Sequence, residues 1–389
     1  MHTFLILSTL SCLGGLAVLA WLHNQHWLDI PVPPAPPPSS DAPLVSVCVP
    51  ARDEEQNIRA CVEAILAQTY PNFELIVVDD RSTDSTPAIL SRLAALDSRM
   101  SVVSGSDLPP GWAGKPHALT QAVGAARGDW LCFVDADTLL APEALSAVYA
   151  KTLETKADLF TMLTRQVMLT FWERAVLPLV MTALSVGFSP RKVNDPRRKD
   201  AIANGQFIFI KRNVYQAVGG HAAIKGSIVE DKDLAVLVKG QGYRLVVADG
   251  RQAASTRMYT SLAHMWEGWT KNIYLGLRDD PGLLWLGAFG AFLAFAAAAL
   301  LPLWAAAGVV LTVTGPGWEG GAILLQALAL WGVLLYYRVQ AARGMGIPAW
   351  YALTTPLGAG VFAAMMLASA WKVLSGRGVT WRGRRYPGA

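Results

Sequence analysis

The chain has 389 residues, of which 53% are hydrophobic and 16% are charged, and its formal net charge is +4. A soluble domain carries about 25% charged residues, so this composition excludes a wholly soluble protein and predicts that part of the chain lies in a membrane. The net charge is small and the arginines gather at the C-terminus, which argues against a nucleic-acid-binding protein.

Residues 3–22 are uncharged and largely apolar, and a helix of about 20 such residues spans the hydrocarbon core of a bilayer. Trp21 and Trp27 suit its interfacial end. We therefore expect a transmembrane anchor over residues 1–23. A cleaved signal peptide is the alternative, but no basic segment precedes the apolar run. The proline-rich stretch Pro31–Pro38 predicts an extended spacer within a linker over residues 24–43.

Residues 44–260 alternate short apolar runs with helical patterns. The runs predict strands at Val45–Val49, Leu75–Val78, Val102–Val103 and Leu131–Val134. This alternation predicts an α/β domain with a doubly wound, parallel sheet. Ligands of such sheets bind beyond the carboxyl ends of the strands. Polar clusters follow three of these ends, at residues 50–55, 79–84 and 135–137, so we expect a site there.

Three long apolar stretches follow Pro281, and they predict C-terminal transmembrane helices within residues 282–376: Leu283–Val313, Ala322–Tyr337 and Trp350–Leu374. Before them, residues 261–281 predict an amphipathic helix at the membrane interface, and residues 377–389 form a basic tail. Three crossings from a cytoplasmic domain would place this tail outside, against the positive-inside tendency. A re-entrant or double first stretch, broken near Pro302, would remove the conflict.

The four cysteines lie in apolar runs without the paired spacing of a metal site: Cys12, Cys48, Cys61 and Cys132. We expect free buried thiols in a reducing compartment. Oxygen ligands offer a better metal site, because Asp135 and Asp137 follow a buried strand and repel one another at this spacing. Mg²⁺ or Mn²⁺ is commonly held by one or two such carboxylates together with substrate phosphates. A solvated turn is the alternative interpretation of this Asp-x-Asp pattern.

Six blocks in a fixed order give the Asp-x-Asp pattern its context: residues 49–55, 77–86, 114–115, 128–129, 134–137 and 229–231. Together they resemble the family 2 glycosyltransferases over about Val45 to Asn272. The resemblance implies a nucleotide-sugar-binding domain of the GT-A type, an inverting mechanism and a Mg²⁺ or Mn²⁺ cofactor.

The resemblance also implies roles for individual residues. Asp231 would be the catalytic base, with Glu230 beside it, and Asp135 and Asp137 would hold the metal. The donor-binding residues would be Pro50, Arg52, Glu54, Asp79, Asp80, Lys115 and Asp135. Physical chemistry supports a carboxylate base, since an acceptor hydroxyl must lose its proton as it attacks. Acids in the first turn of a helix and a solvated lysine are the alternatives for Glu230, Asp231 and Lys115.

Residues of three segments bear on the acceptor. Gly205 and Gln206 resemble an acceptor-side loop of the family, with a plain strand entry as the alternative. Trp266 and Trp269 lie in the predicted interfacial helix, and we expect them on the acceptor side as well. The apolar stretch 171–188 predicts either a lipid-facing element or a buried helix.

Three further segments look like the hopanoid- and carotenoid-associated membrane subgroup of the family: residues 110–115, 193–198 and 381–386. We therefore expect a single-addition transferase that moves one sugar, from a UDP-sugar, onto a lipid acceptor such as a hopanoid or carotenoid. It would be a multi-pass protein of the inner (plasma) membrane with its catalytic domain in the cytoplasm.

Two other functions remain as alternatives. A processive polysaccharide synthase would carry a Gln-x-x-Arg-Trp motif, whereas this chain has Trp266-Glu267-Gly268-Trp269 in that region. An inactive membrane scaffold built on a transferase domain would be expected to lose one of the acidic positions. All of these positions are present.

Overall fold

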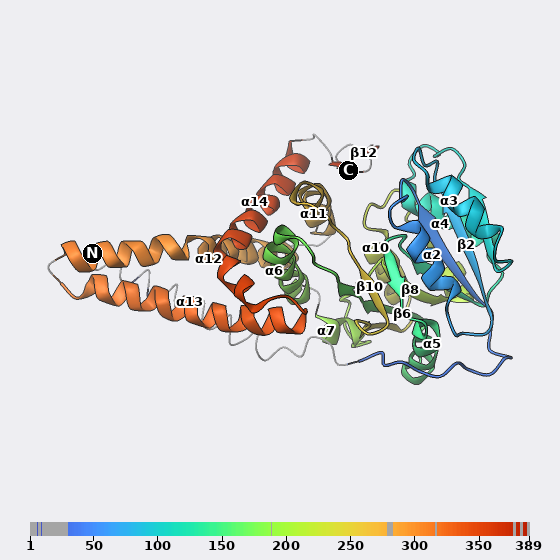
Figure 1. Ribbon diagram of the computed structural model, residues 1–389, viewed down its shortest axis with the longest axis horizontal. Coiled ribbons are helices and arrows are strands. Elements are labelled where there is room, and N and C mark those ends of the chain that lie inside the picture. Colours follow the sequence, from blue (N-terminus) through green and yellow to red (C-terminus); the bar gives the residue numbers. More distant parts are fainter. Residues whose placement is uncertain are drawn as a thin grey trace. The chain divides into compact units, whose positions relative to one another are not determined.

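The computed structural model describes residues 6, 9, 30–187, 189–277, 283–315, 317–375, 379–381 and 384–386 (Figure 1). The chain divides into two compact units. The α/β unit consists of Trp27–Val167 and Phe188–Met258, and the helical unit consists of Met1–His26, Met168–Gly187 and Tyr259–Ala389. Nearly all of the predicted N-terminal anchor, including Cys12, lies outside the described residues.

The centre of the α/β unit is a seven-stranded sheet with the order β3-β2-β1-β4-β8-β6-β9. The strands are β1 (Val45–Ala51), β2 (Phe73–Asp79), β3 (Met100–Ser104), β4 (Trp130–Val134), β6 (Leu159–Leu163), β8 (Phe207–Lys211) and β9 (Leu245–Asp249). The four predicted strands are present as β1 to β4. They consist largely of apolar residues and, apart from the edge strand β3, are largely buried, as befits strands covered on both faces.

The sheet is mixed rather than wholly parallel. Strands β1 to β4 run parallel to one another, and β6 runs parallel to β9, but β8 is antiparallel to both β4 and β6. The expectation of a parallel sheet is therefore wrong at β8. The chain leaves the α/β unit for residues 168–187 before it forms β8, so no local strand-helix-strand crossover sets the direction of this strand.

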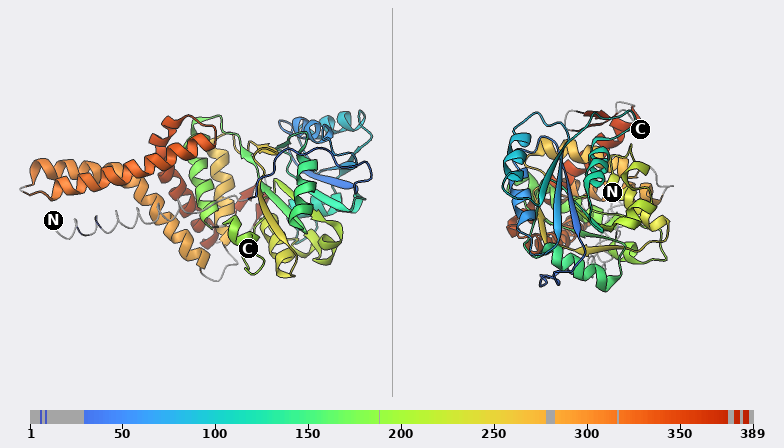
Figure 2. Two further views of the ribbon diagram at one scale, coloured as in Figure 1. Left: turned by 90° about the horizontal axis from the view of Figure 1, so that it is seen from below. Right: turned by 90° about the vertical axis from the view of Figure 1, so that its right-hand side faces the viewer.

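Helices lie on both faces of the sheet (Figure 2). One hydrophobic core joins the sheet to α2 (Ile58–Leu66), α3 (Thr86–Ala94) and α5 (Ala144–Thr155). A second core on the other face includes α4 (Gly114–Ala125), α8 (Arg212–Ala217) and α10 (Glu230–Gly240). Short helices α7 (Pro190–Asn194) and α9 (Gly220–Ala223) complete the unit. Alternate residues of β1 serve the two cores, with Val47 and Val49 in one and Cys48 in the other.

A small second sheet has the order β5-β10-β7, with β5 (Thr138–Leu140), β7 (Arg165–Gln166) and β10 (Ala254–Thr256). Because β5 pairs with β10, the segment that follows β4 lies beside residues 254–256, close to the last residue of the α/β unit in the sequence. The start of the proline-rich stretch also packs on this unit. The backbone N–H of Val32 donates to the Asp249 carbonyl at 3.0 Å, and Val32 is buried in the core. This part of the expected spacer is thus attached to β9.

The helical unit contains α6 (Phe171–Gly187), α11 (Leu262–Leu277), α12 (Leu283–Thr314), α13 (Glu319–Gly344), a 3₁₀ helix η1 (Ala349–Thr354), α14 (Thr355–Leu374) and the hairpin strands β11 (Val379–Trp381) and β12 (Arg384–Tyr386). Helices α12 and α13 lie side by side, whereas α14 runs across them and packs on α12, α11 and α6 (Figure 1).

Cys48, Cys61 and Cys132 are free and buried in the α/β unit, as predicted.

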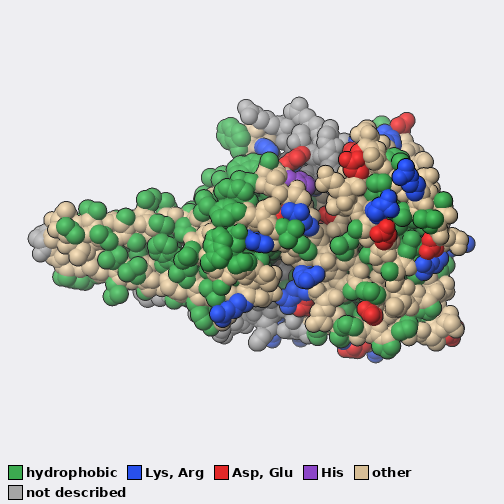
Figure 3. All heavy atoms as spheres, viewed as in Figure 1, with side chains coloured by type: hydrophobic (Ala, Val, Ile, Leu, Met, Phe, Trp, Pro, Cys, Tyr) green, Lys and Arg blue, Asp and Glu red, His purple; other side chains and the backbone are tan. Residues whose placement is uncertain are grey.

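Among the residues that the structure describes, three helical segments are long and apolar enough to cross a membrane: Ala288–Thr314, Glu319–Gly344 and Ala349–Lys372. Hydrophobic side chains gather on the surface of the helical unit, and charged side chains are spread over the α/β unit (Figure 3). The suggestion that the first apolar stretch is a double segment is wrong, because α12 is one helix of 32 residues with Pro302 inside it. Membrane helices tolerate an internal proline where neighbouring groups satisfy the freed carbonyl.

Residues 171–187 of the apolar stretch 171–188 form α6 in the helical unit. Glu173 accepts hydrogen bonds from the backbone N–H groups of Leu169 and Thr170, and so closes the start of this helix. One face of α6, including Ala175 and Val180, is buried, while Phe171 is exposed. The structure therefore favours a helix packed into the unit over one that lies wholly in the lipid interface.

Candidate active site

The loops that follow β1 and β2 are joined by hydrogen bonds at the carboxyl ends of these strands. The backbone N–H of Asp53 donates to the Ser82 hydroxyl at 3.0 Å, and the backbone N–H of Thr83 donates to the Asp53 carboxylate at 2.7 Å. Asp53 and Arg81 have φ angles of 53° and 58°, in the left-handed region that side chains usually avoid. The bonds between the loops hold this strained backbone, so the two strand ends form one wall.

This wall contains five of the residues predicted to bind the donor: Pro50, Arg52, Glu54, Asp79 and Asp80. The Arg52 guanidinium donates to the backbone carbonyl of Asp80 at 2.9 Å, and the Asp80 side chain is buried. Asp79 accepts the backbone N–H of Ser82 at 3.1 Å, and Glu54 accepts the amide of Asn57 at 2.9 Å. Both carboxylates therefore also stabilise the loops that carry them.

A second group of predicted residues converges on the ammonium of Lys115, at the start of α4. Lys115 Nζ lies 2.7 Å from Asp135 Oδ1, which follows β4, and 2.7 Å from Glu230 Oε1, at the start of α10. The next residue, Asp231, accepts the backbone N–H of Gly205 at 2.9 Å. A Cβ atom on Gly205 would come within 2.9 Å of Lys115 Nζ and 3.1 Å of Asp231 Oδ2, so only glycine fits this position without displacing them.

The charges of this cluster shift the pKa values of its members. Burial alone would lower the pKa of Lys115, but the carboxylates of Asp135, Glu230 and Asp231 raise it well above its ordinary value. Burial, together with the charge of Glu230, raises the pKa of Asp231 to about 6. Lys115 and the backbone N–H groups of Lys232 and Gly205 oppose that shift. The pKa of Asp231 is therefore raised toward neutral pH, the range that suits a general base.

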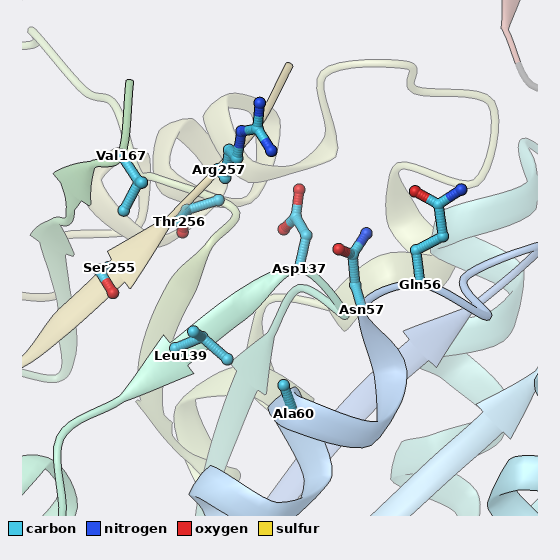
Figure 4. Close-up of a pocket in the computed structure, with 9 residues that line it drawn as sticks. All are labelled: Gln56, Asn57, Ala60, Asp137, Leu139, Val167, Ser255, Thr256 and Arg257. Atoms are coloured by element: carbon cyan, nitrogen blue, oxygen red, sulfur yellow. The ribbon is translucent and has the colours of Figure 1, made fainter. Parts of the chain in front are cut away.

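Asp137 faces a different space from Asp135. It lines a cavity of about 220 Å³ in the α/β unit (Figure 4), together with Gln56, Asn57, Ala60, Leu139, Val167, Ser255, Thr256 and Arg257. Burial and the charges of Asp137, Glu54 and Asp135 raise the pKa of the Cys61 thiol, so these three carboxylates act on one region of α2. The Asp-x-Asp segment thus presents one carboxylate to the lysine cluster and the other to the cavity.

Arg257 is the basic residue of this cavity, and the sequence did not point to it. It follows β10, and its side chain extends over the cavity that Asp137 and Asn57 enter from the other side (Figure 4). A basic residue directly after the last strand of the domain was the available signal. This signal indicates a site residue only once the pairing of β10 with β5 is known, because β5 directly follows the Asp-x-Asp segment.

Asp135 and Asp137 both offer carboxylate oxygens, the donor type that a hard divalent cation prefers, although Asp135 is paired with Lys115 and Asp137 lines the cavity. Across the part of the chain that the structure describes, no group of three or more His, Cys, Asp or Glu side chains is placed to hold a metal ion. Mg²⁺ and Mn²⁺ do not need one, since substrate phosphates and water complete their coordination in many nucleotide sites. The metal role of the two aspartates stays a prediction.

The predicted acceptor-side residues fall in both units. Gln206 is buried in the α/β unit, where its side-chain oxygen accepts hydrogen bonds from Thr164 and Gln166. Trp266 and Trp269 lie on α11 in the helical unit, and Trp269 is buried against Tyr259 with 6.1 Å between the ring centroids. An acceptor-side role for these residues also stays a prediction.

The mixed α/β sheet, with acidic clusters beyond its strand ends, has a fold of the GT-A type. The structure is similar to that of the mannosyltransferase PcManGT from Pyrobaculum calidifontis, solved in complex with GDP-Man and Mn²⁺. The TM-score is 0.57, with 20% sequence identity over 96% of this chain and 98% of that one. This likeness concerns the fold.

Residues 46–219 match the model of the glycosyl transferase family 2, so the chain carries a family 2 glycosyltransferase domain. A curated relative is the 4,4'-diaponeurosporenoate glycosyltransferase of Staphylococcus aureus strain MRSA252, which is 29% identical over 237 residues. The counterpart in strain USA300 has the same identity over the same length. The aligned region covers 60% of this chain and 61% of the length of each relative.

Proposed function

We propose that this protein transfers one sugar from a nucleotide-sugar donor, a UDP-sugar in our assignment, to a lipid acceptor in the inner (plasma) membrane, with inversion at the anomeric carbon. The observation that carries the proposal is the convergence of Asp135, Glu230 and Asp231 on Lys115 at the carboxyl edge of the sheet. The proposed catalytic domain, residues 44–260, would face the cytoplasm, where nucleotide sugars are made available.

Asp231 is the proposed catalytic base. The acceptor hydroxyl gives its proton to the Asp231 carboxylate while its oxygen forms a bond to the anomeric carbon. The bond from that carbon to the diphosphate oxygen breaks at the same time, and its electron pair leaves with the nucleoside diphosphate. Glu230 and Lys115 set the charge around Asp231, which supports a base whose pKa of about 6 lies near the pH of the cytoplasm.

The donor would bind along the wall formed by the loops after β1 and β2. Asp79 and Asp80 supply carboxylates for the nucleoside, and Asp135, Asp137 and Lys115 lie toward the diphosphate. A bound Mg²⁺ or Mn²⁺ would neutralise charge that develops on the leaving diphosphate. Lys115 offers a positive charge for the same group, since its raised pKa keeps it protonated.

A membrane lipid as acceptor is supported by the three helical segments that could cross a bilayer. The relatives from Staphylococcus aureus are named for 4,4'-diaponeurosporenoate, which supports the hopanoid or carotenoid class over a polysaccharide. The absence of a Gln-x-x-Arg-Trp motif favours the addition of a single sugar over processive synthesis. Gly205, Gln206, Trp266 and Trp269 remain our proposal for the acceptor side.

Nucleoside diphosphate release by the full-length protein in detergent tests this function. We expect release from one nucleotide sugar only when a membrane-lipid extract is present, and mass spectrometry should find lipids heavier by one hexose unit. Products with long sugar chains would favour a polysaccharide synthase. No release from any UDP- or GDP-sugar, with every lipid fraction tried, would favour an inactive scaffold.

Lys115→Met is expected to move the acidic limb of the pH–rate profile to higher pH. The Lys115 charge lowers the pKa of Asp231, so its removal leaves the Asp231 carboxylate easier to protonate. Activity should therefore be lost at a higher pH than the value of about 6 expected for the unaltered protein. Initial rates between pH 5 and pH 9 measure the shift. An unchanged limb would show that Lys115 does not act on the base.

A further inference from the structure

Arg338 is a buried cation in the helical unit, and only one of its three guanidinium nitrogens has a hydrogen-bond partner among the described residues. The residue lies on α13 and is 6% exposed. Its Nε donates to the Thr355 hydroxyl, at the start of α14, over 3.2 Å. Both terminal nitrogens are buried and have no hydrogen-bond partner among the described residues. The ion pairs found within the described ranges likewise include none to Arg338, so its charge is not neutralised there by a carboxylate.

The position of Arg338 along α13 corresponds to a membrane surface. Glu319, which begins α13, is 19 residues from Arg338, and a rise of 1.5 Å per residue makes that distance about 28 Å. The hydrocarbon core of a bilayer is about 30 Å thick. Exposed aromatic side chains lie near both ends of this interval, with Trp318 at one end and Tyr336 and Trp350 at the other. Such aromatic residues are typical of the two interfaces, so a bilayer spanned by this interval would have Arg338 at headgroup depth.

The surroundings of Arg338 hold a second cation. The guanidinium of Arg174, on α6, lies 5.6 Å from the ring centroid of Tyr351 in η1, and Thr355 directly follows η1. The turn between α13 and α14 is thus contacted by two arginines. A buried charge without a partner is costly, and ionisable residues at membrane depth commonly serve a ligand.

We propose that Arg338 binds the anionic oxygen group of a membrane lipid, a phosphate or a carboxylate, at the turn formed by the end of α13, η1 and the start of α14. With Nε engaged by Thr355, the two terminal nitrogens form a two-pronged donor that matches two oxygens of such a group. This site is independent of the transferase reaction proposed above. A lipid bound there would fix the helical unit at one depth in the membrane. The site would prefer anionic lipids over neutral ones.

The thermal unfolding of the full-length protein in a neutral detergent tests the site, and Arg343→Met provides the matched control. Arg343 lies on the same helix but is exposed, so both substitutions remove one positive charge from α13. We expect phosphatidylglycerol or oleate, and not phosphatidylcholine, to raise the Tm of the unaltered protein and of Arg343→Met. Arg338→Met should lose this rise, because the lipid stabilises only a protein that binds it.

The comparison of lipids identifies the source of the anionic group. A larger shift with phosphatidylglycerol indicates a phosphate ligand, and a larger shift with oleate indicates a carboxylate. Native mass spectrometry should find one anionic lipid retained by the unaltered protein and lost from Arg338→Met. An equal Tm rise in Arg338→Met, or the whole rise with inorganic phosphate alone, would overturn the proposal.

A purely structural role for Arg338 makes a different prediction. Arg338→Met would then unfold at a lower temperature in neutral detergent without any lipid, whereas our proposal expects no loss there because an unpaired buried charge is removed. Arg338→Lys provides a second variant. It keeps the charge without the two-pronged donor, and we expect a lipid-dependent shift that is smaller than in the unaltered protein. A full shift in Arg338→Lys would argue against a two-pronged contact.

Discussion

Asp231→Asn is expected to reduce kcat by about 10²–10⁴-fold, the usual contribution of a general base, while the affinity for the nucleotide sugar survives. The amide retains an oxygen that can accept the backbone N–H of Gly205, and of the two backbone contacts it loses only the one from the N–H of Lys232 at 2.8 Å. It cannot take up the proton of the acceptor hydroxyl. Nucleoside diphosphate release measures kcat, and calorimetric titration with the donor measures binding.

The pH dependence of the unaltered protein checks the same assignment. Asp231 must be ionised to act as a base, and its pKa is raised to about 6. The rate should therefore fall as the pH drops through about 6 and stay level above it. The residual activity of Asp231→Asn should lack this limb. Asp233→Asn is the matched control in the same helical turn, and its rate and pH profile should be those of the unaltered protein.

Stability measurements separate a lost base from a lost fold. A carboxyl group whose pKa is raised by folding binds its proton more tightly in the folded state. Above pH 6 the ionised Asp231 therefore destabilises the fold relative to the unfolded chain. Asp231→Asn removes this effect, so its Tm at pH 8 should not be lower than that of the unaltered protein. A normal rate of sugar transfer in Asp231→Asn would mean that another residue is the base.

The sequence predicted the parts of the site that depend on local patterns. Polar clusters after β1, β2 and β4 lie at one edge of the sheet, because parallel strands bring their carboxyl ends together. The interpretation of Lys115 was open between a phosphate contact and a solvated side chain. The structure pairs it with Asp135 and Glu230, so Lys115 is not merely solvated, and its contact with a phosphate stays a prediction. Such pairing depends on how α4 and α10 pack on the same face of the sheet, which no local pattern encodes.

Long-range features account for what the sequence did not predict. The cavity at Asp137 requires β10 to pair with β5, although about 115 residues separate these strands. Arg257 belongs to the site for this reason alone. The direction of β8 and the membership of α6 in the helical unit have a common origin, since the chain leaves one unit for the other between β7 and β8. Hydrophobic periodicity reports which residues are buried, but not which unit buries them.

Asp137→Asn is expected to raise the concentration of Mg²⁺ or Mn²⁺ that gives half-maximal activity by at least about tenfold, the scale on which lost support weakens a metal site. The substitution removes a carboxylate from the cavity and leaves the contact between Lys115 and Asp135 in place. Removal of divalent metal with a chelator should abolish turnover in the unaltered protein. Titration of Mn²⁺ in the presence of UDP, followed by electron paramagnetic resonance, reports the same loss without reference to activity.

Glu143→Gln is the control that makes the Asp137 result specific. Glu143 lies six residues further along the chain and does not line the cavity, so the two substitutions remove equal charge from one segment. Only the loss of Asp137 should weaken Mn²⁺ binding. Equal weakening in both variants would indicate a general field effect of the acidic segment. Full activity after metal removal would show that Asp135 and Asp137 do not hold a catalytic metal. Lys115 alone would then balance the negative charge of the leaving diphosphate.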